Sequence, residues 1–283
     1  MSFETSELTL REVPGPSALG GGWRRSLELL YLISVTEFKK TYFGTVLGYL
    51  WSLARPLMLF AVLVTVFTKV LRFPTVQHYP VLLLMNIVLF GFFQEATGIA
   101  VVSVVGQEAI VRKTQFPRLV IPLAVVMTAM FNLMLNLVVV VIFLLAFGVA
   151  PMWTWLLFPI ILVLLVVLTT AVSMIVSSLY PRYRDVAIIW TVFSTALFYA
   201  TPILYAISNV SAHPTLRRLI LLNPLAPIFE LARKWIIQAN VPDPVTAAGG
   251  WPGLAAPAAI YVAICVFAVW IFRREAPRIA EAL

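Results

Sequence analysis

The 283-residue chain is 61% hydrophobic and 11% charged, with a mean hydropathy of +0.98. This composition argues against a soluble globular protein and is typical of a protein that crosses a membrane several times. The net charge of +8 does not indicate nucleic-acid binding, because the basic residues are scattered between apolar runs and form no stripe interleaved with aromatic residues. Cys265 is the single cysteine, so no intrachain disulfide is possible.

The first 22 residues end in three glycines and lack the apolar core of a signal peptide. We expect residues 1–22 to form a mobile cytoplasmic tail and residues 23–283 to form one membrane domain. From Trp23 to Phe43, apolar residues recur every three or four positions with the cations largely on the other side, which predicts an amphipathic helix. We expect this interface helix, within residues 23–48, to lie along the inner leaflet with its cations near lipid phosphates.

Six apolar runs reach the ~17 to 25 residues that a helix needs to cross a bilayer. The predicted spans are roughly Ala54 to Val70, Val81 to Val105, Leu119 to Phe147, Thr154 to Tyr180, Ala187 to Tyr205 and Ala256 to Phe272. The expected fold class is therefore an all-α membrane protein with six transmembrane helices.

The third and fourth predicted spans lie in a run without charge. From Leu119 to Pro181 the chain contains no Asp, Glu, Lys or Arg over 63 residues. A single helix of that length would be about three times as long as the hydrocarbon layer is thick. Gly148 and Pro151 interrupt the run, and Trp153 follows where an aromatic belt is expected. The run therefore predicts two helices joined by a tight turn.

The distribution of cations predicts the orientation of the spans. With the N-terminus inside, 14 of the 20 Lys and Arg residues fall in inner segments. Cytoplasmic segments are enriched in Lys and Arg, so we expect both termini to be cytoplasmic.

Residues 206–255, between the fifth and sixth spans, are too interrupted for two full spans and too apolar for a solvated loop. Asn223-Pro224 and Pro227 divide the apolar residues into short pieces. We expect short helices that dip into the outer leaflet and return. Irregular backbone at this depth is tolerated only where protein or a water-filled cavity surrounds it, which indicates a pathway nearby.

Motifs for catalysis are absent from the sequence. There is no His-Glu-x-x-His, no Gly-x-Ser-x-Gly and no paired acidic motif that would hold Mg²⁺ at a diphosphate, and the two histidines are isolated. We therefore expect no metal site. Glu95, with Gln94 beside it, is the strongly polar feature within a predicted span. A charge at the bilayer centre costs at least ~2.5 kcal/mol, so Glu95 either lines a polar path or bridges to Asn132 or Asn136 on the next span.

Two inner connections are short and dense in charge. Residues 106–118 are expected to form a helix that stops before Pro117, with apolar residues beside cations. The second connection, Arg182-Tyr183-Arg184-Asp185, places an aromatic ring between two cations. The alternative for each connection is that its Lys and Arg residues only anchor the adjoining spans at the inner face of the membrane.

Several motifs in order resemble one family. They are Glu37-Phe38-Lys39-Lys40-Thr41-Tyr42, Leu47-Gly48-Tyr49-Leu50-Trp51, Arg55-Pro56, Phe116-Pro117-Arg118, Ile121-Pro122-Leu123, Arg182-Tyr183-Arg184-Asp185, Thr201-Pro202-Ile203-Leu204-Tyr205, and Asn223-Pro224 ahead of Arg233. On six spans, this set resembles the membrane permease subunits of ABC-2 type transporters that export cell-surface polysaccharides such as O-antigens, teichoic acids and galactan.

The resemblance implies partners and a location. Two permeases pair with two ATPase subunits in the bacterial inner or plasma membrane, and Mg-ATP is held by the ATPase, so no cofactor is expected in this chain. Residues 106–118 correspond to a coupling helix on the ATPase, and the short helices of residues 206–255 to an extracytoplasmic gate. The implied ATPase contacts are Ile110, Arg112, Lys113, Phe116, Pro117 and Arg118.

The resemblance also implies a substrate channel formed by the first and fifth spans at the interface of two permeases. Aromatic rings on these spans can stack on the apolar faces of sugars, although at least half of them are expected only to pack helices. The expected channel residues are Tyr49, Trp51, Phe193 and Tyr199. A permease for a drug or lipid is the alternative cargo assignment. An intramembrane enzyme of polyprenyl-linked sugar metabolism fits less well, because it needs clustered acids or a nucleophile with its base.

Overall fold

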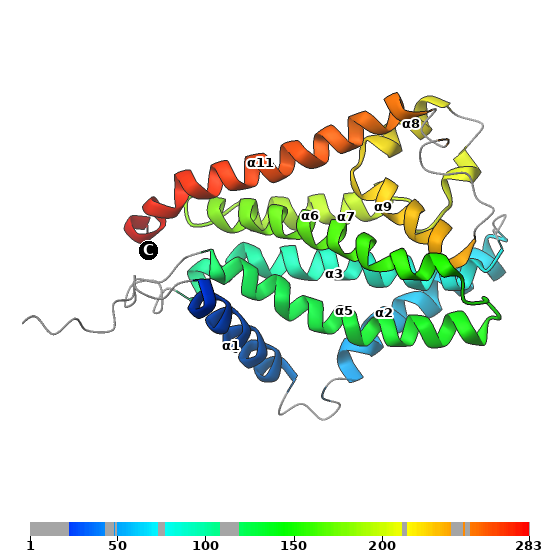
Figure 1. The fold of residues 1–283 in the computed structure, drawn as a ribbon, viewed down its shortest axis with the longest axis horizontal. Coiled ribbons are helices and arrows are strands. Elements are labelled where there is room, and N and C mark those ends of the chain that lie inside the picture. Colours follow the sequence, from blue (N-terminus) through cyan, green and yellow to red (C-terminus); the bar gives the residue numbers. More distant parts are fainter. Residues whose placement is uncertain are drawn as a thin grey trace, which may run out of the picture.

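The computed structural model describes residues 23–42, 48, 50–72, 77–107, 119–210, 214–238, 246 and 250–282. Every regular element in these ranges is a helix (Figure 1). Among the described residues, five helices are long and apolar enough to cross a membrane: Leu50–Val70, Tyr79–Gly106, Val120–Ala146, Trp153–Leu179 and Gly253–Glu275. The predicted all-α membrane class is confirmed, with five such spans by length.

Helix α3 (Tyr79–Gly106) forms the centre of the bundle. It packs against α5 (Val120–Ala146), α6 (Phe158–Leu179), α2 (Leu50–Thr65) and α7 (Val186–Ala200), which surround it in Figure 1. Of its apolar window, 67% is buried, whereas Phe60 is the single buried residue of α2 and η1 (Val66–Val70) has none. A helix that is apolar all round is suited to such a central position.

The turn in the charge-free run is confirmed between α5 and the 3₁₀ segment η2 (Trp153–Leu157) that precedes α6. Gly148 has a φ of +74°, a left-handed conformation that glycine adopts without steric cost. Its N–H donates to Leu145 O, and the Val149 N–H donates to Leu144 O. These two bonds satisfy carbonyls at the end of α5 that have no partner within the helix.

The fifth predicted span, Ala187 to Tyr205, is helical only as far as Ala200. Thr201 is extended, with φ −87° and ψ 144°, because the residue before a proline is pushed out of the α region, and Pro202 follows. The irregular backbone after α7 is held by α3. Asn86 Nδ2 donates to Pro202 O at 3.2 Å, and the Tyr79 hydroxyl donates to Leu204 O at 2.8 Å. Irregular backbone in a membrane region is satisfied in this way by neighbouring protein groups.

Short helices fill the region between α7 and α11 (Trp251–Ala282). They are η3 (Ile207–Val210), α8 (Pro214–Leu222), α9 (Leu225–Ala232) and the π-helical η4 (Arg233–Ile237). Figure 1 shows α8 and α9 at the end of the bundle opposite the C-terminal end of α11. The predicted short helices are therefore present within residues 206–255.

The predicted N-terminal helix is present as α1 (Trp23–Tyr42), and it packs against α5 at an oblique angle (Figure 1). The Ser34 hydroxyl donates to Ala124 O at 3.3 Å, and Phe38 makes an edge contact with Phe131 at a centroid distance of 5.5 Å. The expected tail, residues 1–22, lies outside the described residues.

Candidate functional site

The predicted ATPase contacts Ile110, Arg112, Lys113, Phe116, Pro117 and Arg118 all lie outside the described residues, as does the channel residue Tyr49. The ends of the first inner connection are described: α3 ends at Gly106, and α5 begins at Val120. These two helices share the largest contact in the bundle.

The second inner connection, Arg182 to Asp185, forms the turn between α6 and α7. The guanidinium of Arg182 lies over the ring of Tyr183 at 5.2 Å, and that of Arg184 lies over Tyr180 at 5.0 Å. Arg182 also lies 4.0 Å from the buried carboxylate of Glu275 on α11. The turn is therefore tied to the last helix, a contact that the sequence analysis did not predict.

The predicted channel residues that the structure describes are exposed on α2 and α7. Trp51 is 52% exposed, Phe193 53% and Tyr199 62%. Other aromatic residues of α7 turn inward instead: Phe198 contacts Phe90 at a centroid distance of 5.3 Å, and the Trp190 indole N–H donates to Thr97 Oγ1. The aromatic residues of α7 thus divide between an exposed face and helix packing.

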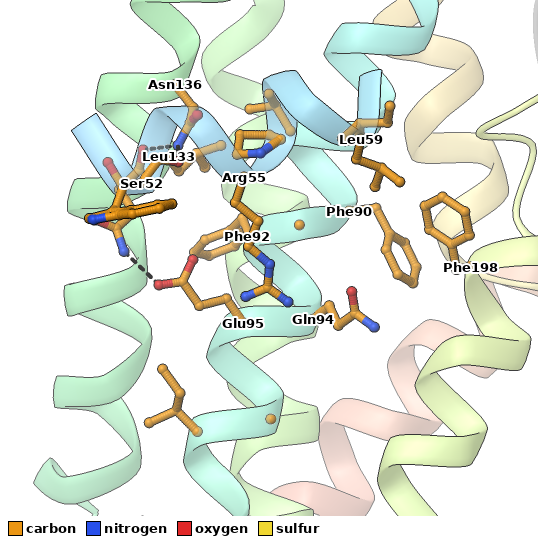
Figure 2. Close-up of a pocket in the computed structure, with 18 residues that line it drawn as sticks. Ser52, Arg55, Leu59, Phe90, Phe92, Gln94, Glu95, Leu133, Asn136 and Phe198 are labelled. Carbon is orange, nitrogen blue, oxygen red and sulfur yellow. Dashed lines mark hydrogen bonds between the residues drawn. The ribbon is translucent and has the colours of Figure 1, made fainter. Parts of the chain in front are cut away.

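A pocket of about 490 Å³ opens between α2, α3, α5 and α7. Figure 2 shows the Arg55 side chain reaching from α2 into this pocket, with its guanidinium between Glu95 and Gln94 of α3. Trp51 and Phe198 line it as well. Charged, amide and aromatic side chains therefore meet within the bundle, beside the exposed faces of α2 and α7.

Glu95 contacts the next span directly. The Asn132 Nδ2 amide donates to Glu95 Oε1 at 2.5 Å, while the carboxylate also lines the pocket (Figure 2). Glu95 therefore bridges to Asn132 and also lines a polar cavity, so the two interpretations that the sequence left open do not exclude each other. A charged group placed in this way faces protein and a cavity and avoids lipid, as the cost of burying a charge requires.

Proline chemistry explains how α2 is fixed to α5 at the pocket. Pro56 has no N–H, so it cannot donate the usual helical hydrogen bond to the carbonyl of Ser52, four residues earlier in α2. Asn136 Nδ2 donates to that carbonyl at 3.4 Å and to Asn132 O at 2.8 Å. The α5 amide thus supplies a donor to the carbonyl that would otherwise accept from the N–H that proline lacks.

The described residues hold no group of three or more His, Cys, Asp or Glu side chains that would bind a metal ion. The pocket contains one carboxylate, with no nucleophile and base in contact among its lining residues. The side chains that line it offer hydrogen-bonding groups and aromatic ring faces.

Arg55 is the pocket residue that the sequence analysis did not select. In the sequence, Arg55 stands near the start of the first predicted span, where a cation is expected to mark the inner face of the membrane. The neighbouring Pro56 could have indicated a polar site at Arg55, because a proline in a membrane helix needs polar groups from neighbouring helices.

Comparison with known proteins gives a consistent assignment. The model of the family described as ABC-2 type transporter matches residues 28–237. The chain is 26% identical over 259 residues to the "O-antigen export system permease protein RfbA" of Myxococcus xanthus, which covers 90% of this chain and 95% of that protein. It is 33% identical over 180 residues to a protein of the same name from Klebsiella pneumoniae, which covers 63% of this chain and 69% of that protein. The family match spans the helices that form the pocket, and the chain belongs to the ABC-2 type transporter family.

Proposed function

We propose that this chain is the permease subunit of an ATP-driven exporter of a lipid-linked cell-surface polysaccharide. Family membership makes it the membrane subunit of a transporter. Two of its relatives, from Myxococcus xanthus and Klebsiella pneumoniae, are named for O-antigen export, which favours a glycan over a drug or a simple lipid as cargo.

One observation carries the proposed pathway: the chain itself leaves α2 and α7 largely uncovered, beside the polar pocket that both helices line. Phe60 is the buried residue of α2, and Ser194 is that of α7. Uncovered apolar faces in this position suit a second copy of the permease, with the path between the two copies. Trp51, Phe193 and Tyr199 then offer ring faces to sugars, and Tyr49 is proposed to join them.

Single alanine substitutions at Tyr49, Trp51, Phe193 and Tyr199 test this pathway. Loss of surface polysaccharide is expected for the variants that remove a stacking ring, while ATP hydrolysis by the copurified complex reports that the permease is folded. Full export by all four variants would contradict the proposed path.

The proposed topology has six crossings. Helix α7 is 15 residues long, which gives about 22 Å at 1.5 Å per residue and falls short of the ~30 Å hydrocarbon layer. We propose that the segment after Thr201 completes the fifth crossing, and that α8, α9 and η4 form a re-entrant gate at the outer face. Both termini are then cytoplasmic.

Thiol labelling tests the topology. Cys265→Ser gives a cysteine-free background, into which Thr114→Cys is introduced. An impermeant maleimide is expected to label residue 114 only after the cells are opened. Labelling from outside intact cells would overturn the orientation.

An ABC ATPase is the proposed partner, with two copies of it joining two permeases and carrying the Mg-ATP. The proposed contact is the connection at residues 106–118, where Phe116 would insert among cations that set the docking orientation. Phe116→Asp is expected to uncouple ATP hydrolysis from export. Normal copurification with the ATPase together with full export by this variant would refute the contact.

A further inference from the structure

The polar groups of the pocket are incompletely partnered. Within the described part of the chain, the Arg55 guanidinium makes no hydrogen bond and no ion pair within 4.0 Å. The Asn132 side chain is 3% exposed, and its Oδ1 atom has no hydrogen-bond partner even though its Nδ2 amide is engaged by Glu95. Buried polar atoms are normally paired, so Asn132 Oδ1 points to a polar ligand, and the exposed Arg55 side chain adds donors to the same pocket.

Two glycines provide the space for such a ligand. Gly91 and Gly98 lie about one turn before and after Glu95 on α3, and all three residues line the pocket. A Cβ atom added at either glycine would meet nothing within 4 Å. The pocket is therefore open in front of the α3 backbone, and its volume of about 490 Å³ is within the ~300–1,000 Å³ of small-molecule sites.

The mixture of donors and acceptors selects the kind of ligand. Arg55 offers only donors, Glu95 offers only acceptors when ionised, and the Gln94 amide offers both. A phosphate, which has acceptors alone, would meet the Glu95 carboxylate, and an ammonium group would meet Arg55. A lipid tail would offer no hydrogen bond to Arg55, Gln94 or the Asn132 Oδ1 atom, which costs free energy wherever such a group is cut off from water. A sugar hydroxyl both donates and accepts, so a polyol pairs with every one of these groups.

Ring faces complete the match. Trp51 and Phe198 line the same pocket. The C–H faces of a pyranose ring are apolar, and an aromatic ring packs against them while the equatorial hydroxyls remain free for hydrogen bonds.

We propose that this pocket binds a neutral sugar unit of the transported glycan through its hydroxyl groups, and that it is distinct from any site for the charged lipid carrier. The inference rests on the proposed export function and assigns Arg55, Gln94, Glu95 and Asn132 as the hydrogen-bonding residues. The charges of Arg55 and Glu95 are opposite in sign and keep the net charge of the pocket near zero, so that it holds a polymer unit without trapping it.

Photocrosslinking in the native host tests the assignment. A benzophenone amino acid is placed at Ile99, which lines the pocket and is 50% exposed, or at Val102, which is on the same helix, is 46% exposed and does not line the pocket. After irradiation, high-mass permease adducts are separated on gels and stained by periodate oxidation, which detects vicinal diols. Glycan adducts are expected at Ile99 and not at Val102.

Two substitutions in the Ile99 crosslinking background distinguish the ligand classes. Gly91→Leu fills the pocket from a position with open space, and it is expected to lower the glycan adduct about tenfold, which corresponds to about 1.4 kcal/mol. Glu95→Gln removes a strong acceptor and is expected to lower the yield. Adduct yield is normalised to permease that copurifies with its ATPase, so a misfolded variant is not counted.

The outcomes separate this inference from the function on which it rests. Unchanged surface polysaccharide after deletion of the gene would refute the export function itself. If polysaccharide is lost on deletion, two other results would refute the sugar site alone. One is adducts at Ile99 that carry lipid phosphate and no glycan. The other is a yield of the glycan adduct that rises in Glu95→Gln. Equal glycan labelling at Ile99 and Val102 would also refute it.

Discussion

The buried ion pair of Glu230 and Arg233 provides the sharpest stability prediction. Glu230 is 6% exposed and Arg233 is 3% exposed, and Nη1 of Arg233 lies 3.5 Å from Glu230 Oε2. Glu230 Oε1 also accepts the Ile207 N–H at 3.2 Å, and Arg233 donates to Gln238 Oε1 at 2.9 Å. The pair thus joins α9 and η4 to η3, which begins at Ile207.

Arg233→Met removes one partner and leaves the Glu230 carboxylate buried beside apolar side chains. Removal of one partner from a buried pair costs about 3–5 kcal/mol of unfolding free energy. The double variant Glu230→Leu/Arg233→Met is expected to recover most of this loss, because replacement of both charges by apolar groups is often neutral. Lys40→Met serves as the control, since Lys40 and Glu37 form a pair at 3.9 Å with side chains 76% and 44% exposed. Its expected cost is below about 1 kcal/mol.

The pH dependence gives a second check on the same pair. Burial raises the pKa of Glu230, so its carboxylate binds a proton more readily in the folded state than in the unfolded chain. A carboxyl with a raised pKa contributes stability that is present below the unfolded pKa of about 4.3 and is lost as the pH rises through the folded value. The penalty of Arg233→Met is therefore expected to be full near neutral pH and to shrink toward acidic pH.

Unfolding by SDS in mixed micelles, followed by circular dichroism at two pH values, measures these free energies. If Arg233→Met lowers the unfolding free energy no more than Lys40→Met does, burial does not make the Glu230–Arg233 pair more important than an exposed pair. A penalty that grew at acidic pH would show that the carboxylate is not the group left unpaired.

Two further substitutions test local features by the same unfolding assay. Tyr79→Phe removes the hydrogen bond to Leu204 O and is expected to cost about 1 kcal/mol, and an unchanged stability would mean that α3 does not hold the segment after α7. Gly148→Ala places a side chain at a φ of +74° and is expected to cost about 1–2 kcal/mol, whereas a stabilised variant would contradict the left-handed turn.

Much of the fold follows from local sequence. The absence of charge from Leu119 to Pro181, together with Gly148 and Pro151, predicts α5, its turn and α6, because helix length and turn chemistry are local properties. The early end of α7 was also accessible, since Pro202 excludes helical geometry at Thr201. Hydropathy alone extended that span to Tyr205 because the residues after Thr201 are apolar.

The pocket was less accessible to sequence reasoning. Glu95 was selected because it is charged within a span, but its contact with Asn132 depends on how α3 and α5 pack. Arg55 reaches the same pocket because α2 crosses α3, and a count of charges along the chain does not report a crossing. Glu275, close to Arg182 in space and 93 positions away in sequence, is a similar case.

The central claim, that this permease moves a lipid-linked glycan across the membrane, is tested most directly by deleting its gene and locating the polysaccharide. Surface polysaccharide and cytoplasmic lipid-linked polymer are measured in the deletion strain, with and without the restored gene. The account predicts that polymer disappears from the surface, accumulates inside on its lipid carrier, and returns to the surface on restoration. Polymer that stays on the surface at the normal level, with none accumulating inside, would contradict it.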